Sequence, residues 1–218
     1  MKKTTKIAVV AAGLAAASAL TFTFVGGGSS AAPVLADLPV GTAAPAFRLG
    51  DSNGRLVSLA DFRGKTVVLE WSNPDCPTVK KHYESGNMQK TQAAAASAGI
   101  VWLTINSSGE GNQGHMTSAE AKDFTAGQPS RRTAYLLDPA GGVGKAYGAK
   151  TTPHMYIVDA AGTLVYNGGI DDKPTTDKAD IAGARNHVLA ALRELKAGKP
   201  VSVPTSRPYG CTVKYGDA

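Results

Sequence analysis

Cysteine is scarce in this sequence, and its scarcity limits the chemistry that the chain can perform. Cys76 and Cys211 are the only cysteines among 218 residues, so there is no C-x-x-C pair and no zinc motif built from cysteine pairs. The four histidines share no ligand spacing with one another or with either cysteine. The sequence therefore predicts no metal site and no other cofactor.

The chain also lacks the patterns that nucleic acids and phosphate groups require. No run of basic residues is interleaved with aromatic ones, and aromatic residues make up only 6% of the composition. The glycine-rich stretches at 109–114 and 141–148 have no lysine placed as in a phosphate-binding loop. We therefore expect no nucleic-acid partner, and we interpret these stretches as turns or short helical segments.

The first 36 residues have the order of regions that is typical of a signal peptide. Three lysines form a short basic region, residues 7–25 are apolar, and small residues lead to a cleavage site after Ala36. The apolar run is nearly long enough to span a membrane, so an uncleaved anchor is the alternative. In either case we expect residues 37–218 to be exported, to a periplasmic or extracellular location. They have 20 basic and 17 acidic residues, a net charge of only +3.

Apolar runs alternate with helical patterns along residues 37–199, which we expect to form one domain. The predicted strands, with the closing hairpin, lie at 56–59, 66–71, 100–106, 134–138 and 154–169. Helices are predicted from Pro77, at 88–99, from 117, at 141–149 and at 176–197. This alternation predicts an α/β fold with a central mixed sheet, which is mainly parallel, has helices on both faces and gains an antiparallel edge from the hairpin.

Residues 200–218 differ from the rest of the chain. They contain three prolines and show no helical period. The sequence therefore predicts an extended, irregular C-terminal tail, and this tail carries Cys211.

The stretch WSNPDCPTVKK, residues 71–81, places Cys76 where a buried strand gives way to a helix. Pro77 follows at once and suits the first helical position, because it lacks an N–H group. A cysteine at a helix N-terminus lies near unpaired N–H groups and the positive end of the helix dipole, which both stabilise a thiolate. We interpret Cys76 as a reactive nucleophile. A buried structural cysteine is the alternative.

Three segments of the chain resemble the thioredoxin superfamily, in its redoxin or AhpC/TSA-like, peroxiredoxin-like branch. They are VVLEWSNPDCPTVKK around Cys76, the stretch 136–172 with Thr152 and Pro153, and PYGCTVKY around Cys211. The resemblance implies a thioredoxin-like fold in which Thr152–Pro153 forms a cis-proline loop that faces Cys76. It also implies thiol, disulfide or peroxide substrates and an antioxidant or oxidoreductase activity.

The same resemblance suggests which residues contact a substrate. The candidates are Trp71, Pro77, Thr152, Pro153 and His154. His154 follows the proline directly and is expected to lie near enough to Cys76 to tune it or to move a proton. A solvent-facing histidine at a strand start is the alternative, and Trp71 also has the position of a core residue.

The sequence departs from the family's two usual cysteine motifs. Val79 stands where a local second cysteine of a C-x-x-C pair would be. Asn73 and Leu69 stand where peroxiredoxins have the hydroxyl residue and the proline that precede their cysteine. The resemblance therefore implies thiol chemistry but does not choose between peroxidase, oxidase and reductase.

Cys211 is the remaining thiol that could resolve an adduct on Cys76. The extended tail is long enough to bring it there, and Gly210 allows a close backbone approach. The alternative belongs to another functional class: a non-catalytic binding module in which a Cys76–Cys211 disulfide only fastens the tail. We expect protein or small-molecule thiols and disulfides as partners, and peroxide as a further substrate. We expect a membrane contact only if residues 1–36, the predicted signal peptide or leader, are not cleaved.

The leader generates the first prediction. The exported protein should begin at Asp37, because the small residues before it match a cleavage site. Intact-mass measurement of the secreted or periplasmic protein checks this. A mature form that still contains Met1–Ala36 would instead support the anchor.

Overall fold

The structure, a computed structural model, describes residues 37–216. The predicted leader lies outside these residues, so its cleavage and its use as an anchor stay predictions. Between residues 37 and 216 no helix is both long enough and apolar enough to cross a membrane.

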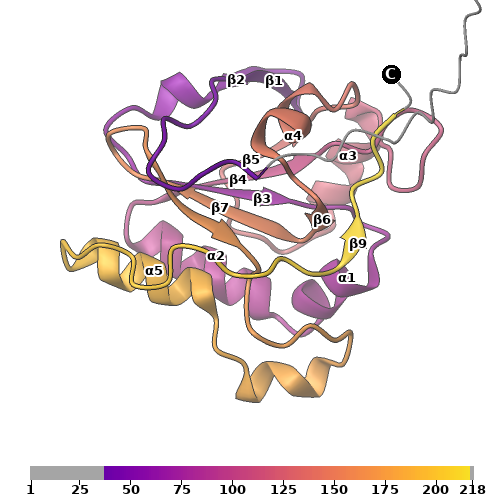
Figure 1. Ribbon diagram of the computed structural model, residues 1–218. Helices are drawn as coiled ribbons and strands as arrows, with labels where there is room; N and C mark the ends of the chain where they lie inside the picture. Colours follow the sequence, from indigo (N-terminus) through magenta and orange to yellow (C-terminus); the bar gives the residue numbers. More distant parts are fainter. Residues whose placement is uncertain (1–36, 217–218) are drawn as a thin grey trace, which may run out of the picture. The chain divides into compact units, whose positions relative to one another are not determined.

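The described residues form strands, α-helices and two 3-10 helices (Figure 1). The strands are β1 (Arg48–Asp51), β2 (Leu56–Ser58), β3 (Val67–Trp71), β4 (Val101–Asn106), β5 (Ala134–Leu137), β6 (Thr151–Thr152), β7 (His154–Val158), β8 (Leu164–Gly168) and β9 (Cys211–Thr212). The α-helices are α1 (Pro77–Glu84), α2 (Asn87–Ser97), α3 (Ser118–Ala126), α4 (Gly142–Tyr147) and α5 (His187–Lys196). The 3-10 helices are η1 (Leu59–Phe62) and η2 (Lys178–Gly183).

Seven strands form the central sheet, in the order β2-β1-β5-β4-β3-β7-β8. Strands β3, β4 and β5 are parallel, whereas β7 and β8 continue the sheet in antiparallel fashion. The predicted α/β fold, its mixed sheet and its antiparallel closing hairpin are therefore confirmed. The prediction that the sheet is mainly parallel is wrong, because four of its six strand pairings are antiparallel. The opposite edge is also antiparallel, because β1 and β2 form a hairpin that the sequence predicted only in its second strand.

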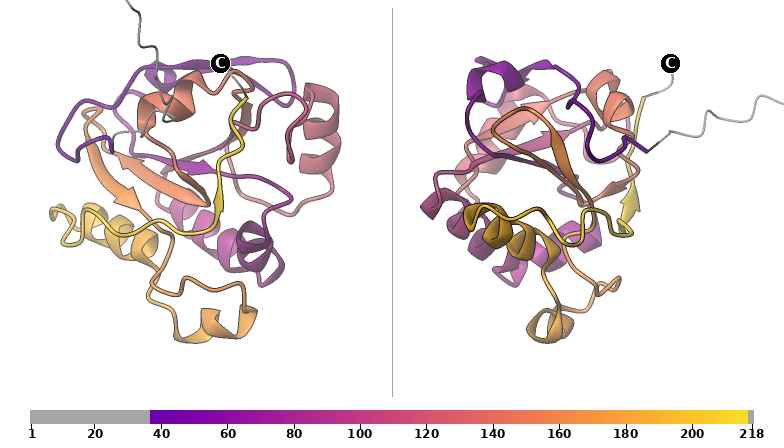
Figure 2. Two further views of the ribbon diagram at one scale, coloured as in Figure 1. Left: turned by 45° about the vertical axis from the view of Figure 1, so that its right-hand side comes forward. Right: turned by 60° about the vertical axis from the view of Figure 1, so that its left-hand side comes forward.

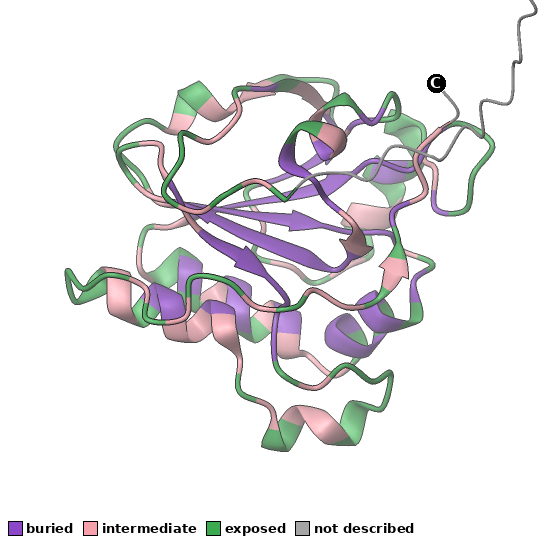
Figure 3. Cartoon of the chain, in the orientation of Figure 1, coloured by how far each residue is buried: buried purple, intermediate pink, exposed green. Residues whose placement is uncertain are grey.

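Side chains of β3 alternate between the two faces of the sheet, as the pleat requires. Val67, Leu69 and Trp71 belong to one apolar cluster, whereas Val68 belongs to the other. All five residues of β3 are buried, because one apolar cluster covers each face of the strand (Figure 3). Packing on both faces holds in place the strand that leads to Cys76.

Glu70 is the polar exception in β3, and its contacts attach α1 to the sheet. The carboxylate is fully buried and accepts hydrogen bonds from the Tyr83 hydroxyl of α1 at 2.9 Å and from the Trp102 indole at 2.8 Å. The Thr104 hydroxyl adds a third bond at 3.0 Å. A buried carboxylate requires such partners, and here they come from the helix and from the neighbouring strand.

The helix predicted at 176–197 is wrong in its first half. Residues 178–183 form η2 and the chain is extended at Ala184, so that α5 begins only at His187. The side chain of Asn186 accepts a hydrogen bond from the Leu189 N–H, which makes Asn186 an N-cap rather than an interior residue. The apolar spacing continues across residues 184–186, but the capping asparagine makes the α-helix begin only at His187.

The buried centre of β3 provides a test of the packing. Leu69→Ala should lower the free energy of unfolding by about 2–5 kcal/mol, because it opens a cavity among fully buried neighbours. Urea denaturation followed by tryptophan fluorescence measures the change. Leu56→Ala is the matched control, since Leu56 is 60% exposed and its replacement should cost less than about 0.5 kcal/mol. Equal effects for the two variants would contradict the assigned core.

Candidate active site

Cys76 lies at the start of α1, immediately after the loop that follows β3. It is the N-cap residue of the helix, with Pro77 at the first helical position, as the sequence predicts. Its carbonyl oxygen accepts the first helical hydrogen bond, from Lys80 N–H at 2.9 Å. The sulfur is thus attached to the end of a helix at which backbone N–H groups are unpaired.

The Cys76 side chain is fully buried beneath the loop that contains Thr152 and Pro153. The peptide bond between these two residues is cis, as expected. In its thiol form, Cys76 Sγ donates a hydrogen bond to the Thr152 carbonyl oxygen at 3.0 Å. The structure therefore brings the predicted cysteine and the predicted loop into direct contact.

The C-terminal tail covers the same loop and brings the second thiol to the site. Strand β9 pairs with β6 in antiparallel fashion, with Cys211 opposite Thr152. The tail is otherwise irregular, as predicted, and runs from α5 past β8 before it reaches β6 (Figure 2). Cys211 packs against the apolar cluster that contains Cys76, and both thiols are free.

Gly210 permits the close approach of the tail. Its φ of +131° is one that residues with a side chain rarely adopt, and an added Cβ would lie 2.0 Å from the Thr152 carbonyl oxygen. No residue with a side chain fits at this position without moving the tail. The glycine therefore sets the distance between β9 and β6.

The two thiols differ in acidity. Burial opposes ionisation of Cys76, but its polar surroundings at Cys211 and Thr152 outweigh burial and lower the pKa of Cys76. Burial, followed by the hydrogen bond and the charge of Cys76, raises the pKa of Cys211 to about 11. As the pH rises, Cys76 therefore loses its proton before Cys211 does.

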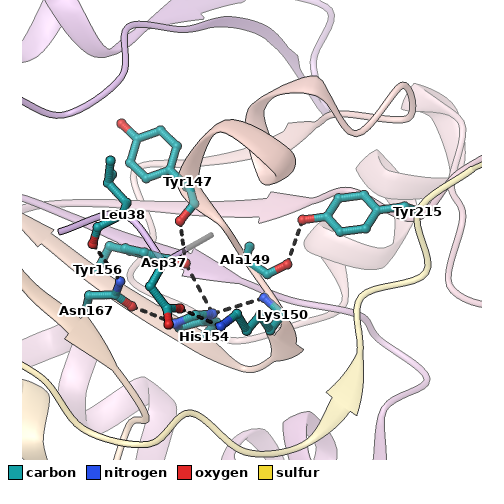
Figure 4. A network of polar contacts seen from close by, with 9 residues as sticks. All are labelled: Asp37, Leu38, Tyr147, Ala149, Lys150, His154, Tyr156, Asn167 and Tyr215. Carbon is teal, nitrogen blue, oxygen red and sulfur yellow. Dashed lines mark hydrogen bonds and ion pairs between the residues drawn. The ribbon is translucent and has the colours of Figure 1, made fainter. Parts of the chain in front are cut away.

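His154 supports the loop from inside the sheet and does not bond to Cys76. Its Nδ1 accepts from the Lys150 N–H at 3.2 Å, so Nε2 carries the proton and donates to Asn167 Oδ1 at 2.8 Å (Figure 4). Burial lowers the pKa of His154 to about 4, so the ring is neutral near pH 7. The expected solvent-facing alternative is wrong, since the ring is fully buried. The predicted tuning of Cys76 by His154 stays a prediction.

The same network reaches the first described residues. Asn167 Nδ2 donates to the Leu38 carbonyl oxygen at 3.1 Å, and Lys150 forms an ion pair with Asp37 at 2.7 Å (Figure 4). The segment that follows the predicted cleavage site is thus bound to the strand and loop that carry His154. These contacts hold the loop in place behind Thr152.

The remaining predicted contact residues differ in exposure. Trp71 is fully buried, donates from Nε1 to Ser107 Oγ at 3.0 Å and packs against Tyr156, so it has the environment of a core residue. Pro153 is buried as well, whereas Pro77 is exposed. Whether any of them contacts a substrate stays a prediction.

Two tyrosines hold the tail on either side of Cys211, and the sequence analysis did not identify their role. The Tyr209 hydroxyl donates to Asp171 and accepts from His82 Nε2 at 3.1 Å. The Tyr215 hydroxyl donates to the Ala149 carbonyl oxygen at 2.8 Å. The tyrosines that flank the cysteine in PYGCTVKY were the available signal, because aromatic side chains in an irregular tail need a surface to pack on.

No metal site accompanies the thiols in the described part of the chain. Residues 37–216 contain no cluster of three or more histidine, cysteine or acidic side chains that could hold an ion.

The chain is similar to several known proteins. A family model described as Redoxin matches residues 39–184. A hypothetical protein of Sinorhizobium meliloti is 26% identical, with a TM-score of 0.70, over 84% of this chain and 98% of that chain. An uncharacterised conserved protein of Geobacillus kaustophilus is 27% identical, with a TM-score of 0.68, over 83% of this chain and 94% of that chain.

A more distant structure identifies the fold. A candidate thiol:disulfide interchange protein, DsbE, of Chlorobium tepidum is 24% identical, with a TM-score of 0.50, over 60% of this chain and 85% of that chain. This likeness concerns the fold alone and confirms that it is thioredoxin-like. No curated protein matches the chain.

The proximity of the two cysteines gives a prediction about the acidity of Cys76. Cys211→Ala should raise the pKa of Cys76, because it removes a polar group that lowers this pKa. The rate of Cys76 alkylation by iodoacetamide, measured against pH, should then show its inflection at higher pH than in the wild type.

Cys211→Ser is the matched control for this prediction, since a hydroxyl also donates a hydrogen bond. Its inflection should lie between those of the wild type and Cys211→Ala. An unchanged profile in Cys211→Ala would contradict the assigned contact.

Proposed function

Because the chain belongs to the Redoxin family, we propose that it is an exported thiol–disulfide oxidoreductase in which Cys76 is the nucleophile and Cys211 the resolving thiol. The observation that carries the proposal is the meeting of two free thiols at Thr152, with the pKa of one lowered and that of the other raised. A pair of cysteines that only fastened a tail would not require this difference in acidity.

The reaction begins with the thiolate of Cys76. It attacks one sulfur of a substrate disulfide, so that a bond forms between Cys76 and that sulfur while the other substrate sulfur leaves as a thiolate. Cys211 gives its proton to the leaving thiolate and then attacks Cys76 Sγ. The second substrate thiolate departs, and two electrons have moved from the cysteine pair to the substrate as the Cys76–Cys211 disulfide forms.

The reverse half of the cycle begins at Cys211. Cys76 is fully buried, whereas Cys211 is partly exposed, so an incoming thiolate reaches Cys211 first. Attack there expels Cys76, which is the better leaving group because its thiol has the lower pKa. The burial of Cys76 and its lower pKa thus both favour attack of the incoming thiolate at Cys211.

The surroundings of Asn73 favour disulfides over peroxides as substrates. Its Oδ1 accepts from the Asp75 N–H at 2.9 Å, and its Nδ2 donates to the Gln113 carbonyl oxygen at 3.0 Å. Both ends of the amide are engaged in holding the loop before Cys76. Asn73 therefore does not replace the hydroxyl group that orients a peroxide in the related motif.

Access to Cys76 requires movement of the tail when the substrate is large. The contact between β6 and β9 is only two residues long, although Tyr209 and Tyr215 reinforce it. A protein disulfide reaches Cys76 only after β9 has left β6. Small disulfides need a smaller displacement.

The roles of the two cysteines can be separated by substitution. Cys76→Ser should abolish the reduction of a protein disulfide, since it removes the nucleophile. Cys211→Ser should still form a mixed disulfide with the substrate but should not turn over, because it lacks the resolving thiol. Assays of the mature protein and mass analysis of trapped adducts measure both effects. Full activity of Cys76→Ser would reject the proposal.

The linkage itself distinguishes a redox pair from a structural disulfide. Peptide mapping of the oxidised protein should find a Cys76–Cys211 disulfide, and a thioredoxin-like donor should open it. A linkage that resists such a donor would favour the non-catalytic binding module. The absence of any linkage after oxidation would exclude both functions.

A further inference from the structure

The tail is held unequally on the two sides of Cys211. After this cysteine, Val213 is buried and its N–H donates to the Lys150 carbonyl oxygen at 3.1 Å. Before it, the stretch 207–210 forms no hydrogen bonds within the described chain other than those of the Tyr209 hydroxyl group. The side of the tail with fewer attachments, which should open more readily, is therefore held by one polar side chain.

The Tyr209 hydroxyl group lies between a histidine and a carboxylate. Asn87 Nδ2 donates to His82 Nδ1 at 2.8 Å, so His82 Nε2 carries the proton and donates to the Tyr209 oxygen at 3.1 Å. The hydroxyl group in turn donates to Oδ1 of Asp171, which is 3% exposed. Burial lowers the pKa of His82 to about 4, so the imidazole keeps this neutral form near pH 7. Each donor thus has a defined acceptor, and a hydrogen bond to a carboxylate is roughly twice as strong as one between neutral groups.

Lys81 covers the ring of Tyr209. Its Nζ lies 5.8 Å from the ring centroid and donates to the carbonyl oxygens of Lys173 and Thr175 at 3.0 Å each. Because Lys81 is buried, its ammonium group attracts the face of the aromatic ring with little competition from water. Lys81 and the histidine both belong to α1, whose N-cap is Cys76. The helix that presents the nucleophile therefore also binds the tail through Tyr209.

We propose that the Tyr209 hydroxyl group makes the oxidoreductase select disulfides by size, because it holds the tail closed at Cys76. A small disulfide reaches the buried thiol with little movement of the tail, whereas a protein disulfide reacts only while Tyr209 is released. Tyr209 is thus a positioning residue for Cys211, and it takes no part in the exchange of electrons. This inference rests on the proposed function and leaves its reaction unchanged.

Oxidation of the reduced mature protein by an excess of disulfide tests the selection by size. The two reagents are hydroxyethyl disulfide, which is small and uncharged, and insulin, whose disulfides belong to a folded protein. Tyr209→Phe removes the hydroxyl group and keeps the ring, so the rate with insulin should rise about tenfold, a difference of about 1.4 kcal/mol. The rate with hydroxyethyl disulfide should change much less. Acid quenching followed by mass analysis measures the oxidised fraction over time.

Tyr147→Phe is the matched control for this substitution. The Tyr147 hydroxyl group donates to the Pro45 carbonyl oxygen at 2.7 Å and makes no bond to the tail. The ratio of the rate with insulin to the rate with hydroxyethyl disulfide should therefore stay as in the wild type.

Asp171→Asn tests whether the effect passes through the Tyr209 hydroxyl group. It replaces the charged acceptor with a neutral amide oxygen, so the same ratio should rise, but less than in Tyr209→Phe. Added to Tyr209→Phe, it should cause no further rise, because the hydroxyl group on which it acts is absent. Substitutions that only loosened the fold would act independently, and their effects would add.

The outcomes separate this inference from the function on which it rests. An unchanged rate with insulin in Tyr209→Phe, in a protein whose thiols still react with hydroxyethyl disulfide, would overturn the inference alone. An equal rise with both disulfides would overturn it as well, since the tail would then not discriminate by size. So would additive effects of Tyr209→Phe and Asp171→Asn. A wild-type protein that forms no Cys76–Cys211 disulfide with either reagent would overturn the proposed function and this inference with it.

Discussion

The candidate site depends on the backbone of Thr152, which contacts both cysteines. Its carbonyl oxygen accepts the hydrogen bond of the Cys76 thiol, and its strand pairs with Cys211. One peptide unit thus aligns a sulfur at the start of α1 with a sulfur in the tail. In this arrangement the pKa of Cys76 is lowered and the pKa of Cys211 is raised.

The surrounding structure keeps this peptide unit in place. Buried His154 binds the backbone of Lys150 on one side and Asn167 on the other, so the loop is held from within the sheet. From outside, Tyr209 and Tyr215 hold the tail against the same loop. The buried imidazole of His154 has a pKa of about 4 and stays neutral near pH 7. The hydrogen bonds of His154 to Lys150 and Asn167 therefore do not change with pH in that range.

The tail has two consequences that oppose each other. It supplies the second thiol at close range, yet it also covers Cys76, which is fully buried as a result. A short pairing of β6 with β9, fastened by hydroxyl groups, provides contact without permanent closure.

The sequence by itself determined the local features of the site. An apolar run that ends at Trp71, a proline after Cys76 and two β-rich runs after Pro153 specify a strand, a helix start and a hairpin, because each depends on neighbouring residues only. Only the tertiary structure decided that Cys211 meets Thr152, which lies 59 residues earlier in the chain. It also decided that Asn186 interrupts the predicted last helix and that Asp171 faces the tail. Such contacts join residues that are distant in sequence, and no local pattern specifies them, since they depend on which strands and loops the whole sheet brings together.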